Sequence, residues 1–194
     1  GARPLPQGAW QVRADLVETN TLVADGPSAA GFAGVLNLEQ TRLNLTVKRG
    51  LWPGGEGGVE LPLSYGWGGA LDSFIDAFEH LIAMRRDLRR DEASVGGQNQ
   101  YRYMVTRSGG AFLQGPSGNW DIGDLALTVK HAVWEEADAT AALRAGVKLP
   151  TGRPSRASGS GDADLARGVA GDLRRPPLTA YANLSGTFPL GRFR

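Results

Sequence analysis

The sequence contains no cysteine and only two histidines, His80 and His131. The absence of cysteine excludes a disulfide scaffold, catalysis by a thiol and metal sites built from thiolates. Neither histidine stands in a spacing typical of metal ligands. We therefore expect no metal site and no cofactor.

The sequence also lacks an excess of charge of either sign, since 21 basic residues stand against 20 acidic ones and the net charge is +1. A balance of this kind argues against nucleic acid as a partner. No apolar run approaches the ~20 residues of a membrane-spanning helix, although membrane β-strands carry a much weaker signal and stay possible. The opening "GARPLPQGAW" has no apolar signal-peptide core, which fits either a mature end left by cleavage or a cytoplasmic start.

Glycine, in contrast, is frequent, with 28 residues that fall mainly between segments of alternating polarity. Alternation with a period of two is typical of β-strands that have one apolar face. The alternating segments are 9–17, 39–51, 59–65, 99–107, 111–115, 123–133, 140–149, 163–173 and 178–188. Short polar or glycine-rich turns join most of them. The pattern predicts an all-β chain, an antiparallel up-and-down meander or β-barrel of about eight strands, in a single domain over residues 1–194.

One segment follows a different period. In "ALDSFIDAFEHLIAMRRDLRR" the apolar residues Leu71, Phe74, Phe78 and Leu81 recur at helical spacing. Acidic residues come early and arginines late, as the helix dipole favours. We predict one amphipathic helix over about 70–88, inserted between strands and lying at one rim of the barrel or inside it.

Alternation alone does not say which face of the sheet points outward. A soluble barrel turns its apolar face inward, and a membrane barrel turns it toward lipid. Two features favour lipid: the apolar face consists largely of small and medium side chains, and the polar face carries whole charges in mid-strand. These charged residues are the candidates for a water-filled pore: Arg13, Asp15, Arg42, Lys48, Lys130, Arg144 and Lys148. A soluble sheet remains the alternative.

No motif of an enzyme or of a bound ligand withstands inspection. The glycine- and serine-rich stretch 150–162 lacks the Gly-Lys-Ser/Thr ending of a phosphate loop, and we expect an exposed hairpin loop there. Residues 161–164 supply two aspartates, too few oxygen ligands for calcium. Asp72 and Asp76 lie one helical turn apart, where the helix dipole explains them, and His80 has no catalytic setting. We therefore expect no catalysis.

Aromatic residues gather near the ends of the predicted strands. Tyr101 and Tyr103 alternate with basic residues, as on a surface that stacks nucleobases, but they also share one face with Val105 as in an ordinary barrel strand. The tryptophans near strand ends are Trp52, Trp67, Trp120 and Trp134. Tryptophan at strand ends is typical of the aromatic girdles of membrane barrels.

Several short motifs resemble known outer-membrane families of Gram-negative bacteria. "GVKLPTG" followed by "GSGDADLARGVA" is similar to a pattern in phenol-degradation MetA-pathway transporter-like proteins. A nearer resemblance is to the DUF3187 family, in "VELPL", "GGALDSFIDAFEHL", "NQYRY" and "IGDLALTVKHAV". The resemblance implies an outer-membrane β-barrel, but no known activity and no site residues. Because such barrels often end on an aromatic residue and this chain ends "FPLGRFR", we expect an incomplete copy.

These observations predict a passive protein of the outer membrane: a pore, a conduit for small molecules or ions, or a structural barrel in the lipid bilayer. The basic excess among the candidate pore residues predicts a mild preference for anions. The alternative is a soluble periplasmic β-barrel that binds a lipid or another apolar ligand inside.

Overall fold

The computed structural model describes residues 1–25, 31–82, 99–115 and 117–191 of the chain. Its elements are β1 (Trp10–Asp25), β2 (Phe32–Trp52), β3 (Gly55–Trp67), α1 (Leu71–Leu81), β4 (Arg102–Arg107), β5 (Gly110–Gln114), β6 (Trp120–Ile122), β7 (Leu125–Glu135), β8 (Ala139–Leu149), the short helix η1 (Pro154–Arg156), β9 (Asp164–Arg175) and β10 (Leu178–Pro189). All ten strands belong to one sheet, and every pairing between them is antiparallel.

The sheet is an up-and-down meander in which two rows of strand are interrupted. β4 pairs with the first part of β2 while β3 pairs with the rest, so β3 and β4 lie one after the other in a single row. β5, β6 and β7 form the next row in the same way, along β4 and β3. The sheet therefore has seven rows: β1, β2, β3 with β4, β5 with β6 and β7, β8, β9 and β10. Short connections between consecutive rows account for the antiparallel order.

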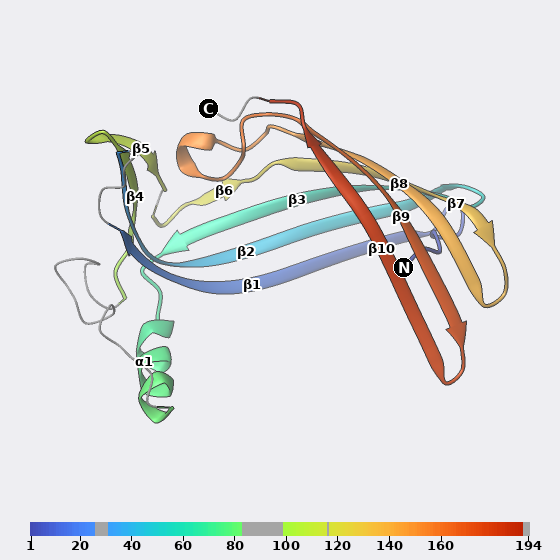
Figure 1. The fold of residues 1–194 in the computed structure, drawn as a ribbon, viewed down its shortest axis with the longest axis horizontal. Coiled ribbons are helices and arrows are strands. Elements are labelled where there is room, and N and C mark those ends of the chain that lie inside the picture. The colour runs from blue at the N-terminus through green and yellow to red at the C-terminus, as the bar shows by residue number, and fades with distance from the viewer. Residues whose placement is uncertain (26–30, 83–98, 116, 192–194) are drawn as a thin grey trace.

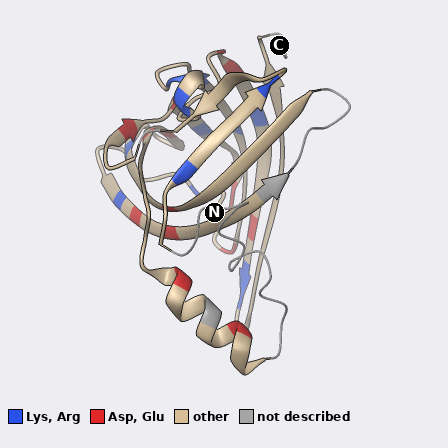
Figure 2. Ribbon diagram, turned by 90° about the vertical axis from the view of Figure 1, so that its left-hand side faces the viewer, with Lys and Arg blue, Asp and Glu red and all other residues tan. Residues whose placement is uncertain are grey.

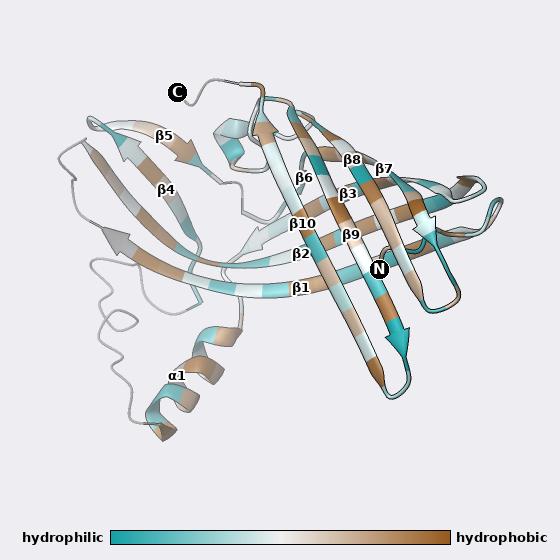
Figure 3. Cartoon of the chain, turned by 45° about the vertical axis from the view of Figure 1, so that its right-hand side comes forward, coloured by the Kyte–Doolittle hydropathy of each residue, from teal (hydrophilic) through white to brown (hydrophobic). Residues whose placement is uncertain are grey.

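The strand register places apolar residues side by side across the whole sheet. One line of paired residues runs through Val12, Val47, Val59, Leu127, Val147, Leu165 and Phe188. Because side chains alternate along a strand, the neighbouring lines point to the opposite face and are rich in polar residues. Figure 3 shows this alternation as brown and teal bands along the strands.

The sheet curls into a half-barrel, as Figures 1 and 2 show. Among the described residues the curl is not closed, since β1 pairs only with β2 and β10 pairs only with β9. The side chains of β10 are exposed along its whole length. We call the inner surface of the curl the concave face and the outer surface the convex face.

The predicted fold class is confirmed, with differences in detail. The prediction of about eight strands missed β6, whose three residues are too few for a visible alternation. β2 begins at Phe32 rather than at residue 39, because its first part pairs with β1 and β4 in spite of an imperfect polar pattern. The expected barrel is an open half-barrel.

The helix is shorter in the described residues than predicted, because α1 spans Leu71–Leu81 and the rest of the predicted segment, 83–88, lies outside them. α1 follows β3, at the point where β4 continues the same row, and projects away from the sheet (Figure 1), so it lies outside the curl rather than in its interior. Within the described residues, no helix is long and apolar enough to span a membrane.

Candidate functional site

The two faces of the sheet have the reverse of the polarity that water-soluble proteins show. Four of the seven buried polar or charged side chains lie on the concave face, namely Glu56, Lys130, Thr140 and Asp172; Asn37 and Glu39 share the side of Val47 along β2, and Asp72 lies in α1. The buried apolar residues are nearly all alanine, and large apolar side chains on the convex face are exposed, among them Val12 (73%), Leu16 (70%) and Leu184 (74%). Soluble domains bury such residues and keep charges in water. The concave face is therefore the candidate functional site.

The N-terminal residues 1–8 lie within the curl, against the concave face. Ala2 is fully buried and packs with Ala142 of β8 and Ala170 of β9. Gly8 donates its backbone N–H to the Gly50 carbonyl of β2 over 2.8 Å. A Cβ atom on Gly50 would lie 1.9 Å from the carbonyl oxygen of Pro6, so only glycine permits this approach. The N-terminal segment thus occupies one end of the concave face.

A buried ion pair holds the N-terminal segment in place. Lys130 Nζ lies 2.9 Å from Glu56 Oε1, and both side chains are about nine-tenths buried. Lys130 also donates to the backbone carbonyls of Gly1 (3.2 Å) and Arg3 (3.1 Å), while Glu56 accepts the backbone N–H of Leu5 (2.8 Å). Both charges are therefore compensated, as burial requires.

A cavity of about 530 Å³ lies on the concave face beside the N-terminal segment. Its polar lining comes from facing strands, from the segment itself and from Arg167 at the cavity's edge: Arg3, Gln11, Thr46, Lys48, Glu56, Glu60, Thr128, Lys130, Arg144, Arg167 and Ser185. Arg144 donates to the Gly1 carbonyl over 2.8 Å, and its Nε is buried with no hydrogen-bond partner. The cavity is large enough for small hydrated solutes, and charges of both signs surround it.

The loop of residues 150–162, which contains η1, folds over the concave face near the opposite end. Asp124 fixes it, accepting backbone N–H groups of Gly152 (3.0 Å) and Ser160 (2.9 Å). A Cβ atom on Gly159 would lie 2.3 Å from Asp124 Oδ1, so the small residue lets the loop close over the carboxylate. Burial raises the pKa of Asp124, but hydrogen bonds from Ser160, Gly152 and Lys148 outweigh it and hold that pKa below its ordinary value.

The same loop forms one wall of a second cavity of about 260 Å³. Ala157 and Ser158 of the loop face Gln40 and Arg42 of β2 and Ser64 of β3 there. The loop is therefore part of the concave site, although most of its residues are exposed as expected and only Gly152 among residues 150–162 is buried. Arg156 of the loop lies 3.9 Å from Asp121, which connects the loop to β6.

Tyr101 and Tyr103 also belong to this end of the concave face, where they line a small pocket with Leu38 and Arg156. Burial raises the pKa of Tyr101 to about 12. Both tyrosines therefore lie beneath the loop 150–162, next to Ala157 and Arg156.

The predicted pore residues divide into three groups on the concave side of the sheet. Lys48, Lys130 and Arg144 line the larger cavity, and Arg42 and Lys148 line the smaller one. Arg13 and Asp15 follow Gln11 on the same face of β1, where they form an exposed ion pair of 2.7 Å. The structure therefore brings five of the seven to the two cavities and leaves two near the open edge.

Sequence reasoning missed the acidic partners of these cations. Glu56 stands in the glycine-rich stretch "WPGGEGG", which reads as a turn, yet it belongs to β3 and pairs with Lys130. Lys148 lies 3.2 Å from Asp124 and 2.6 Å from Asp164. The sequence does contain a signal for these partners, because Asp124 lies in the turn before β7 and Asp164 begins β9. The concave face consequently has less basic excess than the sequence indicated.

On the convex face, aromatic residues mark both ends of the apolar surface. Trp52 and His131 lie together at one end, with ring centroids 6.2 Å apart. At the other end Tyr65 pairs with Trp120, with centroids 5.5 Å apart, and Trp67 ends β3. Trp134 lies next to last in β7. The four predicted tryptophans therefore lie at or close to strand ends.

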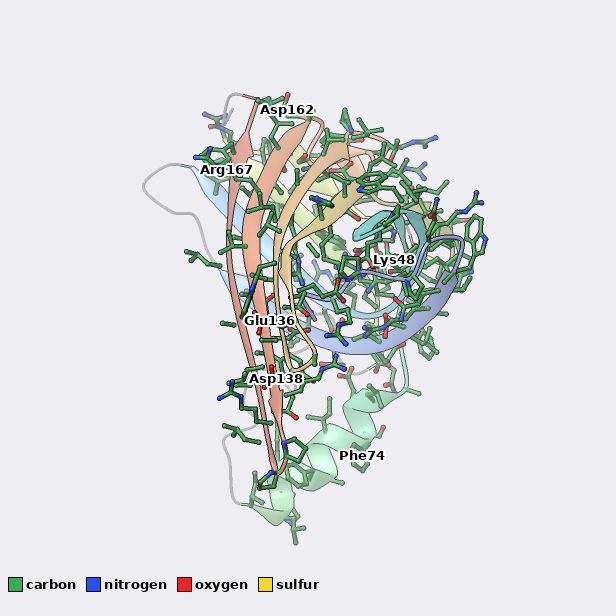
Figure 4. All side chains as sticks on the ribbon, turned by 90° about the vertical axis from the view of Figure 1, so that its right-hand side faces the viewer. Lys48, Phe74, Glu136, Asp138, Asp162 and Arg167 are labelled. Atoms are coloured by element: carbon green, nitrogen blue, oxygen red, sulfur yellow. The ribbon has the colours of Figure 1, made fainter. Side chains whose placement is uncertain are left out.

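Figure 4 looks along the half-barrel and shows Lys48 within the curl and Arg167 on its outside. Arg167 lies over the ring of Phe188 at 4.8 Å. Within the described ranges, no group of three or more histidine, aspartate or glutamate side chains converges as a metal site.

Comparison with known proteins identifies the family of the chain. The model of a family described as "Protein of unknown function (DUF3187)" matches residues 2–188, almost the whole chain. No curated protein and no solved structure matches the chain.

Proposed function

We propose that this chain, which belongs to the DUF3187 family, is a passive β-barrel protein of a Gram-negative outer membrane. Its convex face contacts lipid, and its polar concave face forms a conduit for ions or small polar molecules. The N-terminal segment and the loop 150–162 narrow this conduit at its two ends. Catalysis has no part in the proposal.

The observation that carries the proposal is the reversed polarity of the sheet. In water, the exposed apolar side chains of the convex face would each forfeit about 1.5–3 kcal/mol of burial free energy. In a bilayer the same side chains face hydrocarbon, and the charged groups of the concave face stay hydrated or paired. An apolar surface of this extent on a soluble monomer is rare.

The height of the apolar surface supports a membrane location as well. Trp52 pairs with Gly55 at one end of β3, and Tyr65 marks the other end about ten residues later. At ~3.3 Å per residue and a strand tilt of 35–45°, the two aromatic levels lie about 25 Å apart across the membrane. This separation matches the apolar band of outer-membrane barrels.

The soluble alternative requires an apolar interior for a lipid ligand. The interior of the curl instead holds the ion pair of Glu56 and Lys130, together with Lys48 and Arg144. The polarity of the concave face therefore supports a polar cargo rather than a lipid.

Two neighbouring residues of β2 test the proposal directly. Val47 belongs to the convex line of apolar residues, while Thr46 lines the concave cavity. In phosphatidylcholine vesicles, Val47→Lys should destabilise the protein and lower its free energy of unfolding by about 2–4 kcal/mol. Thr46→Lys should change the free energy of unfolding little. Urea titration followed by tryptophan fluorescence gives both values. Equal, small effects would show that the convex face does not meet lipid.

Conduction is tested separately, by recording currents in planar bilayers under a salt gradient. Neutralising Arg144, as in Arg144→Gln, removes a positive charge from the larger cavity and should shift the reversal potential toward cations. Arg49→Gln is the matched control, because Arg49 lies over the ring of Trp10 on the other face. An unchanged reversal potential in Arg144→Gln would contradict conduction past this residue.

A further inference from the structure

The helix α1 exposes an apolar face to its surroundings. Phe74, Phe78 and Leu81 are exposed to 68%, 52% and 80%, and helical spacing puts the three on one side. Ile82, directly after the helix, is exposed to 47%. The opposite side of α1 carries Asp72 and Glu79. The helix is therefore amphipathic, with its apolar side turned away from the protein.

The first turn of α1 is bound firmly to the sheet. Glu39 of β2, which is 1% exposed, accepts the backbone N–H of Leu71. Asp72, which is 3% exposed, accepts the side-chain amide of Asn20 (2.8 Å) and the backbone N–H of Asn99 (2.7 Å). Because these contacts hold the helix start, the direction of α1 relative to the sheet is set by the fold.

That direction fits the surface of a membrane. α1 begins four residues after Trp67, where β3 ends and β4 continues its row, close to the aromatic pair of Tyr65 and Trp120. Figure 1 shows that α1 runs across the direction of β1, β2 and β3 rather than along it, and Figure 4 shows it beside the half-barrel, with Phe74 on it. A helix across the strands at the aromatic level lies in the plane of the lipid headgroups.

We propose that α1 lies in the lipid–water interface beside the rim of the half-barrel, with Phe74, Phe78 and Leu81 inserted among the acyl chains. This inference rests on the proposed membrane location of the sheet. The occupant of the apolar face is lipid, because the face stands at the same level as the aromatic limit of the apolar convex surface. The test described below also distinguishes lipid from the two other possible occupants, a protein partner and a second copy of this chain.

The absence of native cysteine permits a test with single-cysteine variants. Phe78→Cys and Leu81→Cys place a polarity-sensitive NBD label on the apolar side of α1, and Ser73→Cys places it on the polar side. Leu143→Cys places it on the convex face of β8, where the native side chain is 51% exposed. Each labelled protein is folded into phosphatidylcholine vesicles with and without brominated acyl chains, which quench only labels in contact with lipid.

We expect labels at positions 78 and 81 to be quenched about twofold or more strongly than the label at 73. Quenching at 143 combined with equal quenching at 73, 78 and 81 would overturn the interfacial helix and leave the proposed function standing. Failure of quenching at 143 would overturn both. Labels at 78 and 81 that are shielded from aqueous iodide but not quenched by brominated lipid would mean that protein covers the face, which also overturns the inference.

Discussion

At the scale of single residues, the most informative pair is Glu56 with Lys130. Both charges are removed from water, so each depends on the other and on the backbone groups of Gly1, Arg3 and Leu5. A buried pair need not add stability relative to apolar residues, but an unpaired member is costly. The pair ties the N-terminal segment to the middle of the sheet.

Removing one member of this pair should therefore cost more than removing both. We expect Lys130→Met to reduce the free energy of unfolding by about 3–5 kcal/mol, and the double variant Lys130→Met/Glu56→Gln to recover part of it. Guanidinium titration in detergent micelles, followed by tryptophan fluorescence, measures these values.

Lys48→Met is the matched control. The Lys48 amine lies 3.9 Å from Glu56 and its side chain is 36% exposed, so its loss should cost less than about 1 kcal/mol. A double variant less stable than Lys130→Met would contradict the mutual dependence of the two charges.

At the scale of elements, the loop 150–162 is the part whose role differs most from its sequence. Its glycines and serines are typical of a turn between strands, and that is correct for the chain path between β8 and β9. In the folded protein, Asp124 from the turn between β6 and β7 accepts hydrogen bonds from the backbone N–H groups of Gly152 and Ser160 in the loop. The loop thereby becomes a wall of the smaller cavity.

The lowered pKa of Asp124 predicts that acid releases this loop. A carboxyl whose folded pKa lies below its ordinary value of 3.8 stabilises the closed loop above that value, and the contribution disappears as pH falls further through the lowered pKa. In a hydrogen-exchange series over decreasing pH, the backbone amides of Gly152 and Ser160 should therefore be protected at about pH 6. This protection should disappear only at pH values below the ordinary carboxyl pKa of 3.8.

Asp124→Asn should mimic acid at neutral pH. We expect faster trypsin cleavage after Arg156, whereas Asp138→Asn, at the turn between β7 and β8, should leave that cleavage unchanged. Unaltered cleavage in Asp124→Asn would show that other contacts hold the loop.

At the scale of the whole molecule, the outer strands β1 and β10 each have one strand partner within the described residues, as do the short strands β5 and β6. Long exposed edges of a sheet are open to pairing with further strands. The strands β2, β3, β4, β7, β8 and β9, in contrast, have strand partners on both sides.

Amide hydrogen exchange of the folded protein should follow this arrangement. We expect strong protection in β3 and β8. Because an open strand edge cannot lie in hydrocarbon, the proposed membrane location also requires β1 and β10 to pair with further strands and to be protected in vesicles. Strong protection along β10 would show that another strand pairs with it.

Much of this architecture was predictable from local patterns. Along β7 and β8 apolar and polar residues alternate almost without a break, so the sequence predicts that each segment is a strand, which side chains share a face, and roughly where the strand ends. The period of two is a local property of the backbone and needs no knowledge of the partner strand. β6 and the first part of β2 were not predictable, because their pairing depends on distant strands. For the same reason, the charges of Lys48 and Lys130 were visible in the sequence while their shared partner Glu56 was not.

The sequence by itself determined an antiparallel all-β chain with one amphipathic helix, since periodicity and turn residues act over a few residues. Only the tertiary structure decided which face is concave, that the curl stays open among the described residues, and which elements fold into it. Those properties arise from the curl of the whole sheet, which brings the N-terminal segment to Lys130 and the loop to Asp124 across large separations in sequence. Contacts between residues so far apart in the sequence cannot be predicted from a pattern that extends over a few residues.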